Sequence, residues 1–389
     1  NLQVMNERGV LPHVILGGAA LTRRYVEQDL RQIYKGNVMY ANDAFDGLHY
    51  MEKITSGKAD LRPTDGKTKK IGDVAEEEEL ILSGFEAKIA SAPRQSDVVA
   101  KKSVSSVEVP KAPFYGTKVV EDIFLDEIFY YINEVALIRG QWRVVRGKMA
   151  ESEYQNLLKQ NIYPDFDRLK KRVKKDKLLV PKVVYGYFPC QSEGNDLIIY
   201  KLKGVKDPVI TWNYLSTPTR TDLEEWLRFT FPRQEKGRFL CISDFFASRD
   251  SDRVDVVAFH LVTMGNVASE HSKVLYESNK YKEYLYFHGL SVESAEALAE
   301  LWHKKIREEL NIHQKDSDDV KKLFSQHFRG SRYSFGYPAC PALEDQEKLF
   351  KLLRPERIGV TLTEEYQLVP EQSTSAIIVH HPEARYFNI

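Results

Sequence analysis

The chain has 389 residues, of which 42% are hydrophobic and 29% charged, and its formal net charge is zero. This composition is typical of a globular protein and excludes a disordered one, and the length predicts one to three domains. A molecule without net charge has no general attraction to nucleic acid or to an anionic membrane, and the sequence has no run of about 18 apolar residues that could span a bilayer. We therefore expect a cytoplasmic protein whose partners include neither nucleic acid nor a membrane.

The first segment has the pattern of an α/β unit. Residues 1–9 read as the latter part of a helix, which indicates a piece of a longer protein. His13–Leu16 predicts a short strand, Gly17–Ala20 a tight turn, and Thr22 the N-cap of a helix that runs to about Tyr34. Val38–Tyr40 predicts the next strand. A strand, glycine turn, helix and strand in this order imply a parallel sheet with a right-handed crossover.

From about Thr55 to Ala112 the composition changes to that of a linker, with frequent Lys, Asp, Gly, Ser and Pro. An acidic stretch from Glu76 to Glu79 predicts the start of a short helix within it. Its mixed charge favours extended, solvated segments.

The part that follows mixes helices and strands without the regular alternation of a doubly wound fold. Val183–Pro189 and Leu197–Tyr200 predict a hairpin, because Gly, Asn and Asp at 194–196 supply turn conformations. Val254–Thr263 is apolar on both faces and predicts a central strand, and Arg238–Ile242 predicts a third strand.

A single long amphipathic helix is predicted near residue 300, with Glu296 in its first turn. The residues that recur there at helical spacing are Ala295, Leu298, Trp302, Ile306 and Leu310. Together with the strands, this helix predicts an α+β domain built on a largely antiparallel sheet.

The cysteines give no sign of a disulfide framework or of a zinc cluster. The chain has three of them, Cys190, Cys241 and Cys340, and they lie far apart. An odd number at such spacing favours small packed side chains, and we predict no metal ligands.

Three features invite a functional interpretation, and each also has a purely structural one. Gly17 and Gly18 bring bare backbone to a helix N-terminus, where a phosphate could bind, although glycines are also needed simply for turning. They lack the rest of the dinucleotide fingerprint, which disfavours a nucleotide-binding oxidoreductase.

The loop Arg332–Pro341 joins prolines, a glycine, aromatic rings and an arginine whose planar fork can hold a carboxylate, but a stiff surface loop would look the same. The basic stretch Arg168–Lys177 suits either a solvated helix face or a docking patch for an acidic protein.

Several segments in order resemble cobalamin-dependent methionine synthases. Residues 15–20 and 41–44 resemble the last part of the cobalamin-binding domain, and residues 185–190, 332–341, 362–364 and 381–387 resemble the activation domain. The resemblance implies three parts: the C-terminal remnant of a Rossmann-like cobalamin-binding domain at 1–56, a linker at 57–112, and an α+β activation domain with a largely antiparallel sheet at 113–389.

The resemblance also implies a function. In this family, cobalamin carries a methyl group from methyltetrahydrofolate to homocysteine, and oxidation to cob(II)alamin stalls the cycle. Reactivation needs an electron from flavodoxin or a flavoprotein reductase and a methyl group from S-adenosylmethionine, which together restore methylcobalamin. The implied task of the activation domain is to bind S-adenosylmethionine and to place its methyl group near cobalt, which is largely a matter of positioning.

The activation-domain motifs carry the residues implied to bind S-adenosylmethionine. Arg332 matches the arginine that grips the ligand carboxylate, and Glu296 matches a helix glutamate of the site, as a zwitterionic cation requires. The other matching positions are Tyr333, Ser334, Gly336, Tyr337, Tyr386 and Phe387.

Asp126 is the best counterpart of an aspartate that contacts the ligand early in the domain. Its neighbours depart from the family pattern, in which a tryptophan follows the aspartate, so Glu127 or Glu134 could serve instead, and a solvated helix acid is the structural alternative.

In the first segment, Gly17, Gly18, Ala19 and Ala44 match residues packed against the nucleotide tail of cobalamin, where small side chains allow close approach. The Asp-x-His-x-x-Gly element that supplies the lower-ligand histidine is absent from this sequence, as are the cysteines of the homocysteine-binding zinc site. We therefore expect cobalamin and zinc sites to need upstream domains, and this chain alone to make no methionine. A contrasting hypothesis is a non-catalytic interaction module that docks flavodoxin or a reductase and controls the domain arrangement.

Overall fold

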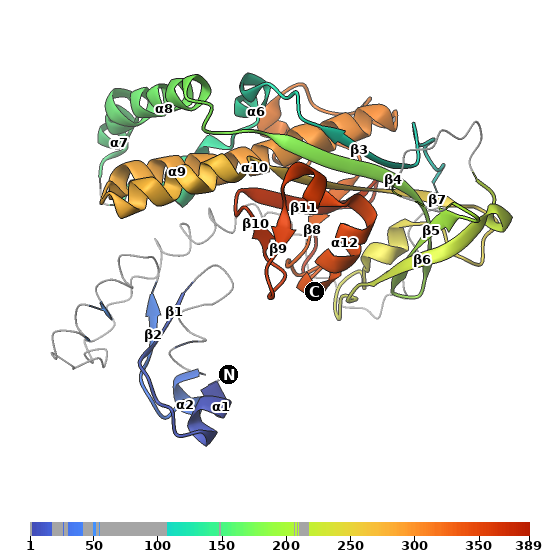
Figure 1. The fold of residues 1–389 in the computed structure, drawn as a ribbon, viewed down its shortest axis with the longest axis horizontal. Helices are drawn as coiled ribbons and strands as arrows, with labels where there is room; N and C mark the ends of the chain where they lie inside the picture. Colours follow the sequence, from blue (N-terminus) through green and yellow to red (C-terminus); the bar gives the residue numbers. More distant parts are fainter. Residues whose placement is uncertain are drawn as a thin grey trace. The chain divides into compact units, whose positions relative to one another are not determined.

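The computed structural model describes residues 2–17, 26, 30–41, 50–51, 54, 107–147, 149–205, 207, 209 and 218–389, and Figure 1 shows their helices and strands. The chain divides into two compact units, Asn1–Glu76 and Glu77–Ile389. The predicted boundary at 56 falls outside the described ranges, whereas that at 112 lies within them, and the predicted division into three parts stays a prediction.

The first unit contains a pair of parallel strands. Its elements are α1 (Leu2–Glu7), β1 (Val14–Gly17), α2 (Arg31–Ile33) and β2 (Val38–Ala41). Ile15 lies opposite Met39 in the parallel register, which confirms the predicted strand pair. Most of the helix predicted to start at Thr22 lies outside the described residues, as does the acidic stretch Glu76–Glu79.

The second unit is built on a seven-stranded sheet in which every neighbouring pair is antiparallel. The strand order is β6-β5-β4-β7-β11-β8, and β3 also pairs with β4. The strands are β3 (Gly116–Val120), β4 (Lys182–Glu193), β5 (Asp196–Leu202), β6 (Leu223–Thr230), β7 (Asp255–Thr263), β8 (Ser331–Ser334) and β11 (Ser373–Val379). A separate two-stranded pair joins β9 (Thr361–Leu362) to β10 (Leu368–Val369). The predicted antiparallel sheet is confirmed.

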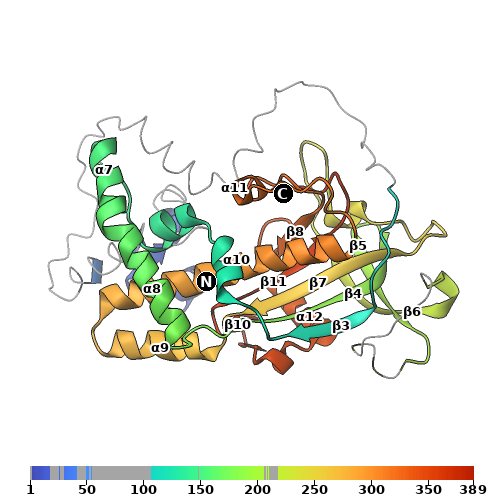
Figure 2. The same ribbon diagram turned by 90° about the horizontal axis from the view of Figure 1, so that it is seen from above.

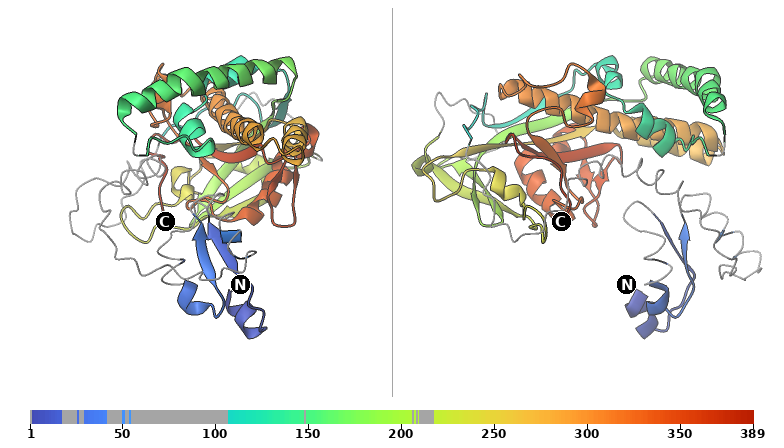
Figure 3. Two further views of the ribbon diagram at one scale, coloured as in Figure 1. Left: turned by 90° about the vertical axis from the view of Figure 1, so that its left-hand side faces the viewer. Right: turned by 180° about the vertical axis from the view of Figure 1, so that it is seen from behind.

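Helices lie on both faces of this sheet. The described α-helices are α6 (Leu125–Tyr130), α7 (Glu151–Leu157), α8 (Tyr163–Lys175), α9 (Asn266–Glu277), α10 (Tyr281–Glu309), α11 (Val320–Leu323) and α12 (Gln346–Leu353). The described residues of this unit also form two π-helical segments (Ala136–Gln141, Leu158–Ile162) and four 3₁₀ turns (Arg220–Asp222, Ile242–Phe245, Leu343–Asp345, Pro355–Ile358). α10 crosses one face over β7 and β11, whereas α12 packs on the other, as Figures 2 and 3 show.

The core has two halves because side chains of a strand point alternately to its two faces. On β7, Val256, Ala258 and Val262 belong to the half that contains α10. The intervening Val257 and Phe259 belong to the half that contains α12. We call these halves the α10-side core and the α12-side core. The buried side chains of β7 thereby face one helix layer or the other, and a smaller third cluster at β5 and β6 contains Ile198, Tyr200 and Leu223.

β4 lies at the centre of the sheet and allows an unusually close approach at Gly186. This residue lies opposite Thr117 of β3 on one edge and Phe259 of β7 on the other. A Cβ atom on Gly186 would lie 2.2 Å from the carbonyl oxygen of Gly116, so only glycine fits there.

The predicted hairpin and central strand are confirmed. β4 and β5 are joined at Gly194 and Asn195, and Gly194 adopts a left-handed φ of 62°. β7 is buried along its whole length, as an apolar run of this kind predicts.

Two local predictions were wrong. The segment Arg238–Ile242 is not a strand, because Gly237 and Phe239 have φ of 78° and 55°, and the chain turns there into the 3₁₀ helix at Ile242. Glu296 is not in the first turn of its helix, because α10 begins at Tyr281, fifteen residues earlier.

The three cysteines are free and buried, as predicted. Within the described ranges, no helix is long and apolar enough to cross a membrane.

Candidate functional site

The guanidinium of Arg332 forms a two-carboxylate ion pair with α10. Its Nε donates to Glu300 at 2.8 Å and its Nη2 donates to Glu296 at 3.0 Å. The side chains of Arg332 and Glu300 are about one-fifth exposed, at 19% and 20%, and Glu296 is more open at 44%. Burial opposes the charged form, but the carboxylates of Glu300 and Glu296 outweigh it and hold the pKa of Arg332 above its ordinary value. Arg332 is therefore a fixed cation beside two acids.

Arg332 is on a strand rather than in the predicted loop. It lies on β8 opposite Ile378 of β11, whose side chain belongs to the α10-side core. Pairing with β11 thus turns the arginine toward α10 and the two glutamates.

A third acid, Glu293, lies one helical turn before Glu296 on α10. The residue is only 7% exposed, and the backbone N–H of Asn133 donates to its carboxylate. Burial, reinforced by the charge of Glu296, raises the pKa of Glu293 to about 8. At neutral pH most molecules therefore keep a proton on this side chain.

Tyr333 points away from Arg332, into the α12-side core. It is 1% exposed, its hydroxyl donates to the carbonyl of Arg385 at 2.8 Å, and its ring packs edge-on against Phe387 with centroids 5.9 Å apart. Phe387 is also buried, and Tyr386 is half-buried. The ring of Phe387 thus packs against Tyr333 of β8, and ligand contacts of Tyr333, Tyr386 and Phe387 stay predictions.

A surface cavity of about 380 Å³ is lined by residues that follow Arg332 closely in sequence. Ser334 and Tyr337 line it, together with Phe335, Leu343, Gln346, Tyr366, Gln367, Leu368, Glu371, Ser373, Thr374 and Ser375. Ser334 follows Arg332 by two positions on β8, so both side chains lie on the same face of the strand. The cavity size is within the range of small-molecule sites.

The turn that carries Tyr337 requires glycine at 336. Gly336 has φ of 89°, and its N–H donates to the carbonyl of Cys340 at 2.8 Å. A Cβ there would also approach Leu343 to 2.9 Å. The turn holds the half-exposed ring of Tyr337 at the cavity.

The structure does not bring Asp126 to Arg332. Asp126 lies on α6 with its side chain 75% exposed, and Lys174 binds its two oxygens at 2.8 and 3.0 Å. Glu127 lies 3.6 Å from Lys305, and Glu134 is exposed. A ligand contact of Asp126 stays a prediction.

The basic stretch Arg168–Lys177 forms much of α8, and three of its seven basic side chains pair with local acids. Lys170 pairs with Asp167 at 3.0 Å and Arg172 with Asp176 at 3.6 Å. Arg168 also pairs with Asp165. These pairs favour a solvated helix face over a docking patch.

Of the residues predicted to touch cobalamin, Gly18, Ala19 and Ala44 lie outside the described residues. Gly17 ends β1 opposite Ala41 of β2. The cobalamin contacts therefore stay predictions.

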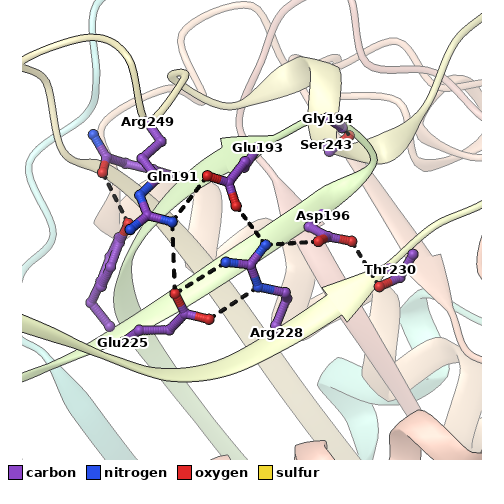
Figure 4. A network of polar contacts seen from close by, with 10 residues as sticks. Gln191, Glu193, Gly194, Asp196, Glu225, Arg228, Thr230, Ser243 and Arg249 are labelled. Carbon is purple, nitrogen blue, oxygen red and sulfur yellow. Dashed lines mark hydrogen bonds and ion pairs between the residues drawn. The ribbon is translucent and has the colours of Figure 1, made fainter.

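A different arginine network, at the opposite end of the sheet, gives a useful contrast. On β6, Arg228 contacts Glu193 at 2.7 Å, Asp196 at 2.8 Å and Glu225 at 3.0 Å, and Arg249 also contacts Glu193 and Glu225, as Figure 4 shows. The Arg228 side chain is 30% exposed, and no residue of β6 lines the 380 Å³ cavity or a second cavity at α8, α9 and α10. Arg332 itself lines neither cavity, but Ser334, on the same strand, lines the first. Arginine–carboxylate clustering alone therefore does not mark a binding site in this protein.

Glu293 and Glu300 were not predicted from the sequence. Both lie at helical spacing from Glu296, three residues before it and four after it, and that spacing is the signal that could have found them. Within the described parts of the chain, no group of three or more His, Cys, Asp or Glu side chains is arranged to hold a metal ion.

The family model and the curated relatives that match this chain agree on one family. Residues 126–389 match the family model described as "Vitamin B12 dependent methionine synthase, activation domain". Methionine synthase of Mycobacterium tuberculosis is 42% identical over 410 aligned residues, which cover 100% of this chain and 33% of that protein. Methionine synthase of Mycobacterium leprae is 42% identical over 416, with the same coverage. The chain thus spans about a third of the length of these curated relatives.

A solved structure shares the fold. The crystal structure of the MetH reactivation domain bound to AdoHcy matches with a TM-score of 0.62 and 23% identity, covering 74% of this chain and 87% of that chain. At this identity the match supports the α+β fold alone.

Proposed function

The chain belongs to the family of the vitamin B12 dependent methionine synthase activation domain, and on that premise we propose that it binds S-adenosylmethionine at Arg332 and supports the remethylation of inactive cobalamin. The larger activity, transfer of a methyl group from 5-methyltetrahydrofolate to homocysteine, belongs in this proposal to a longer methyltransferase that includes upstream domains. A cytoplasmic location, and flavodoxin or a flavoprotein reductase as the electron donor, are parts of the same proposal.

The observation that carries the proposal is the ion pair of Arg332 with Glu296, on the face of β8 that also carries Ser334, a lining residue of the cavity. A guanidinium has five N–H donors, and the contacts with Glu300 and Glu296 use two of them. The remaining donors can hold the carboxylate of an amino acid, and the half-exposed carboxylate of Glu296 can hold its ammonium. A cation and an anion side by side therefore suit the zwitterionic end of S-adenosylmethionine.

The nucleoside end of the ligand suits the cavity that contains Ser334 and Tyr337. An aromatic ring can stack on an adenine, and hydroxyl groups can bind a ribose. Tyr337 and Tyr366 supply rings at this cavity, and Ser334 and Ser373 supply hydroxyls. The AdoHcy bound by the structural relative supports a ligand of this kind.

Cobalamin, when bound, would supply the cobalt that accepts the methyl group. The residues of this chain would hold and orient the ligand whose sulfonium donates that group, which is a positioning role. Small residues such as Gly17 suit close packing against the cofactor.

Calorimetric titration of the chain with S-adenosylmethionine tests the proposal. We expect saturable binding by the wild type and a loss of about 2 kcal/mol or more, roughly 30-fold in Kd, in Arg332→Ala, because a charged bidentate contact is removed. Arg228→Ala is the matched control, because it also removes an arginine bound to carboxylates, and we expect unchanged binding.

Absence of binding by a folded wild type would refute the proposal. If flavodoxin still bound that protein, the alternative interaction module would replace it. An Arg332→Ala variant with unchanged Kd would show that the carboxylate is held elsewhere.

A further inference from the structure

We propose that Glu293 is a specificity-determining residue of the Arg332 site, where its ionised carboxylate favours the positively charged S-adenosylmethionine over the neutral-sulfur product S-adenosylhomocysteine. The inference rests on the proposed function, because it concerns the choice between two ligands of that site.

The position of Glu293 carries the inference. Glu293, Glu296 and Glu300 are separated by three and four residues on α10, so they lie on one face of the helix. Glu296 and Glu300 both bind Arg332. The carboxylate of Glu293 therefore faces the same ion pair one turn earlier, and Glu296 and Arg332 are the described charged groups that act on it.

Arg332 is the cation among the described residues whose charge acts on Glu293. His303 of α10 and His260 of β7 are buried, and the charge of Arg332 helps to lower the pKa of each ring. Burial lowers the pKa of His260 to about 3 and that of His303 well below its ordinary value, so both rings are neutral. Among these described groups, one guanidinium faces two ionised carboxylates when Glu293 is protonated and three when it is ionised.

The two ligands differ by one charge at the sulfur atom. S-adenosylmethionine has a sulfonium, whereas S-adenosylhomocysteine has a neutral thioether in otherwise the same framework. A bound cation favours the ionised form of a nearby carboxyl group, so the sulfonium ligand should lower the pKa of Glu293 and release its proton. The thioether ligand should do neither.

The pKa of Glu293, about 8, lies in an accessible range for this experiment. Between pH 6.5 and 8.5 the free site would change from mostly protonated to mostly ionised. If the sulfonium lowers this pKa by about one unit, the preference for S-adenosylmethionine should rise about five- to tenfold across that interval.

Calorimetry of both ligands at pH 6.5, 7.5 and 8.5 tests the inference in the wild type and in Glu293→Gln. The glutamine keeps an oxygen to accept the N–H of Asn133 but cannot ionise. We expect the ratio of the two Kd values to rise with pH in the wild type and to stay flat in the variant. The variant also accounts for titration of the ligands' own amino groups.

A second readout is the number of protons released on binding. Titrations in two buffers of different ionisation enthalpy near pH 7.5 should show about half a proton more released with S-adenosylmethionine than with S-adenosylhomocysteine. We expect this difference to disappear in Glu293→Gln. Glu308→Gln is the matched control on α10, since it removes a half-exposed acid paired with Lys304, and it should behave as the wild type.

The outcomes separate the two proposals. A wild type that binds both ligands with a pH-independent ratio, or a Glu293→Gln variant that keeps the wild-type pH dependence, would overturn the role of Glu293 while leaving the proposed function intact. A folded wild type that binds neither ligand would refute the proposed function itself.

Discussion

The carboxylate of Glu300 accepts the Nε–H of Arg332 at 2.8 Å, so one edge of the guanidinium is fixed to α10. A planar guanidinium held at one edge has a defined direction for its other N–H groups. Glu300 therefore orients the arginine, whereas Glu296 is more exposed and remains accessible to a ligand.

Replacing Glu300 should loosen the arginine without removing it. We expect Glu300→Gln to weaken S-adenosylmethionine binding about three- to tenfold, because the amide keeps an acceptor but loses the charge that aligns the guanidinium. Calorimetric Kd values would measure this, with Glu308→Gln as the control. Tighter binding in Glu300→Gln would show instead that Glu300 competes with the ligand carboxylate.

Asp126 provides a test of the family resemblance against the geometry of α6. If Asp126 contacts the ligand ammonium, Asp126→Asn should weaken S-adenosylmethionine binding several-fold. Lys174→Met, which removes the observed partner of Asp126 at 2.8 Å, should then leave binding equal or tighter. An unchanged Kd in Asp126→Asn would identify the residue as a solvated helix acid.

The buried pair of Arg307 and Asp316 should be important for stability. Arg307 Nη2 lies 2.7 Å from Asp316, and the two side chains are only 2% and 7% exposed. Asp316→Asn should lower the free energy of unfolding by about 3 kcal/mol, because it leaves a buried guanidinium uncompensated. Urea unfolding would measure the loss, and the more exposed Arg228→Ala should lose about 1 kcal/mol or less. Equal losses would contradict this ranking.

The buried histidines should make the fold sensitive to acid. His303 is neutral in the folded state because burial, followed by the charge of Arg307, holds its pKa well below the ordinary 6.5. The unfolded chain therefore binds more protons as the pH falls below 6.5, and the contribution to stability decreases. Between pH 6.5 and 5 we expect a loss of about 2 kcal/mol from this residue.

The comparison of the wild type with His303→Gln isolates that contribution. Glu293 acts in the opposite direction, since its pKa is raised to about 8 and the folded state keeps its proton where the unfolded state has lost it. Urea unfolding at pH 7, 6 and 5 should give a shallower acid dependence in His303→Gln. Parallel curves would show that His303 does not titrate on unfolding.

The elements that the sequence predicted well are those with a strong local pattern. The apolar run of β7, the Gly194–Asn195 turn and the helical spacing around Leu298 each determine their own structure within a few residues. The failures came from conformations without such a pattern. Phe239 has a left-handed φ of 55°, a conformation that a phenylalanine in the sequence does not predict.

For the candidate site, the sequence predicted Arg332 and Glu296 but not their surroundings. That Arg332 lies on a strand depends on pairing with Ile378, which is distant in sequence. The burial of Glu293 depends likewise on which face of α10 meets the sheet and the segment at Asn133. Spacing along a helix could suggest both additional glutamates, but only tertiary packing distinguishes them from surface acids.

The place of β11 in the sheet has a consequence for biosynthesis. β11 follows every other strand of the sheet in sequence, yet it lies between β7 and β8. On a translating ribosome, the apolar edge of β7 and the strand that carries Arg332 must therefore wait for residues 373–379 before they can pair. Until then β7 presents an unpaired edge, the kind of surface that chaperones protect in nascent chains.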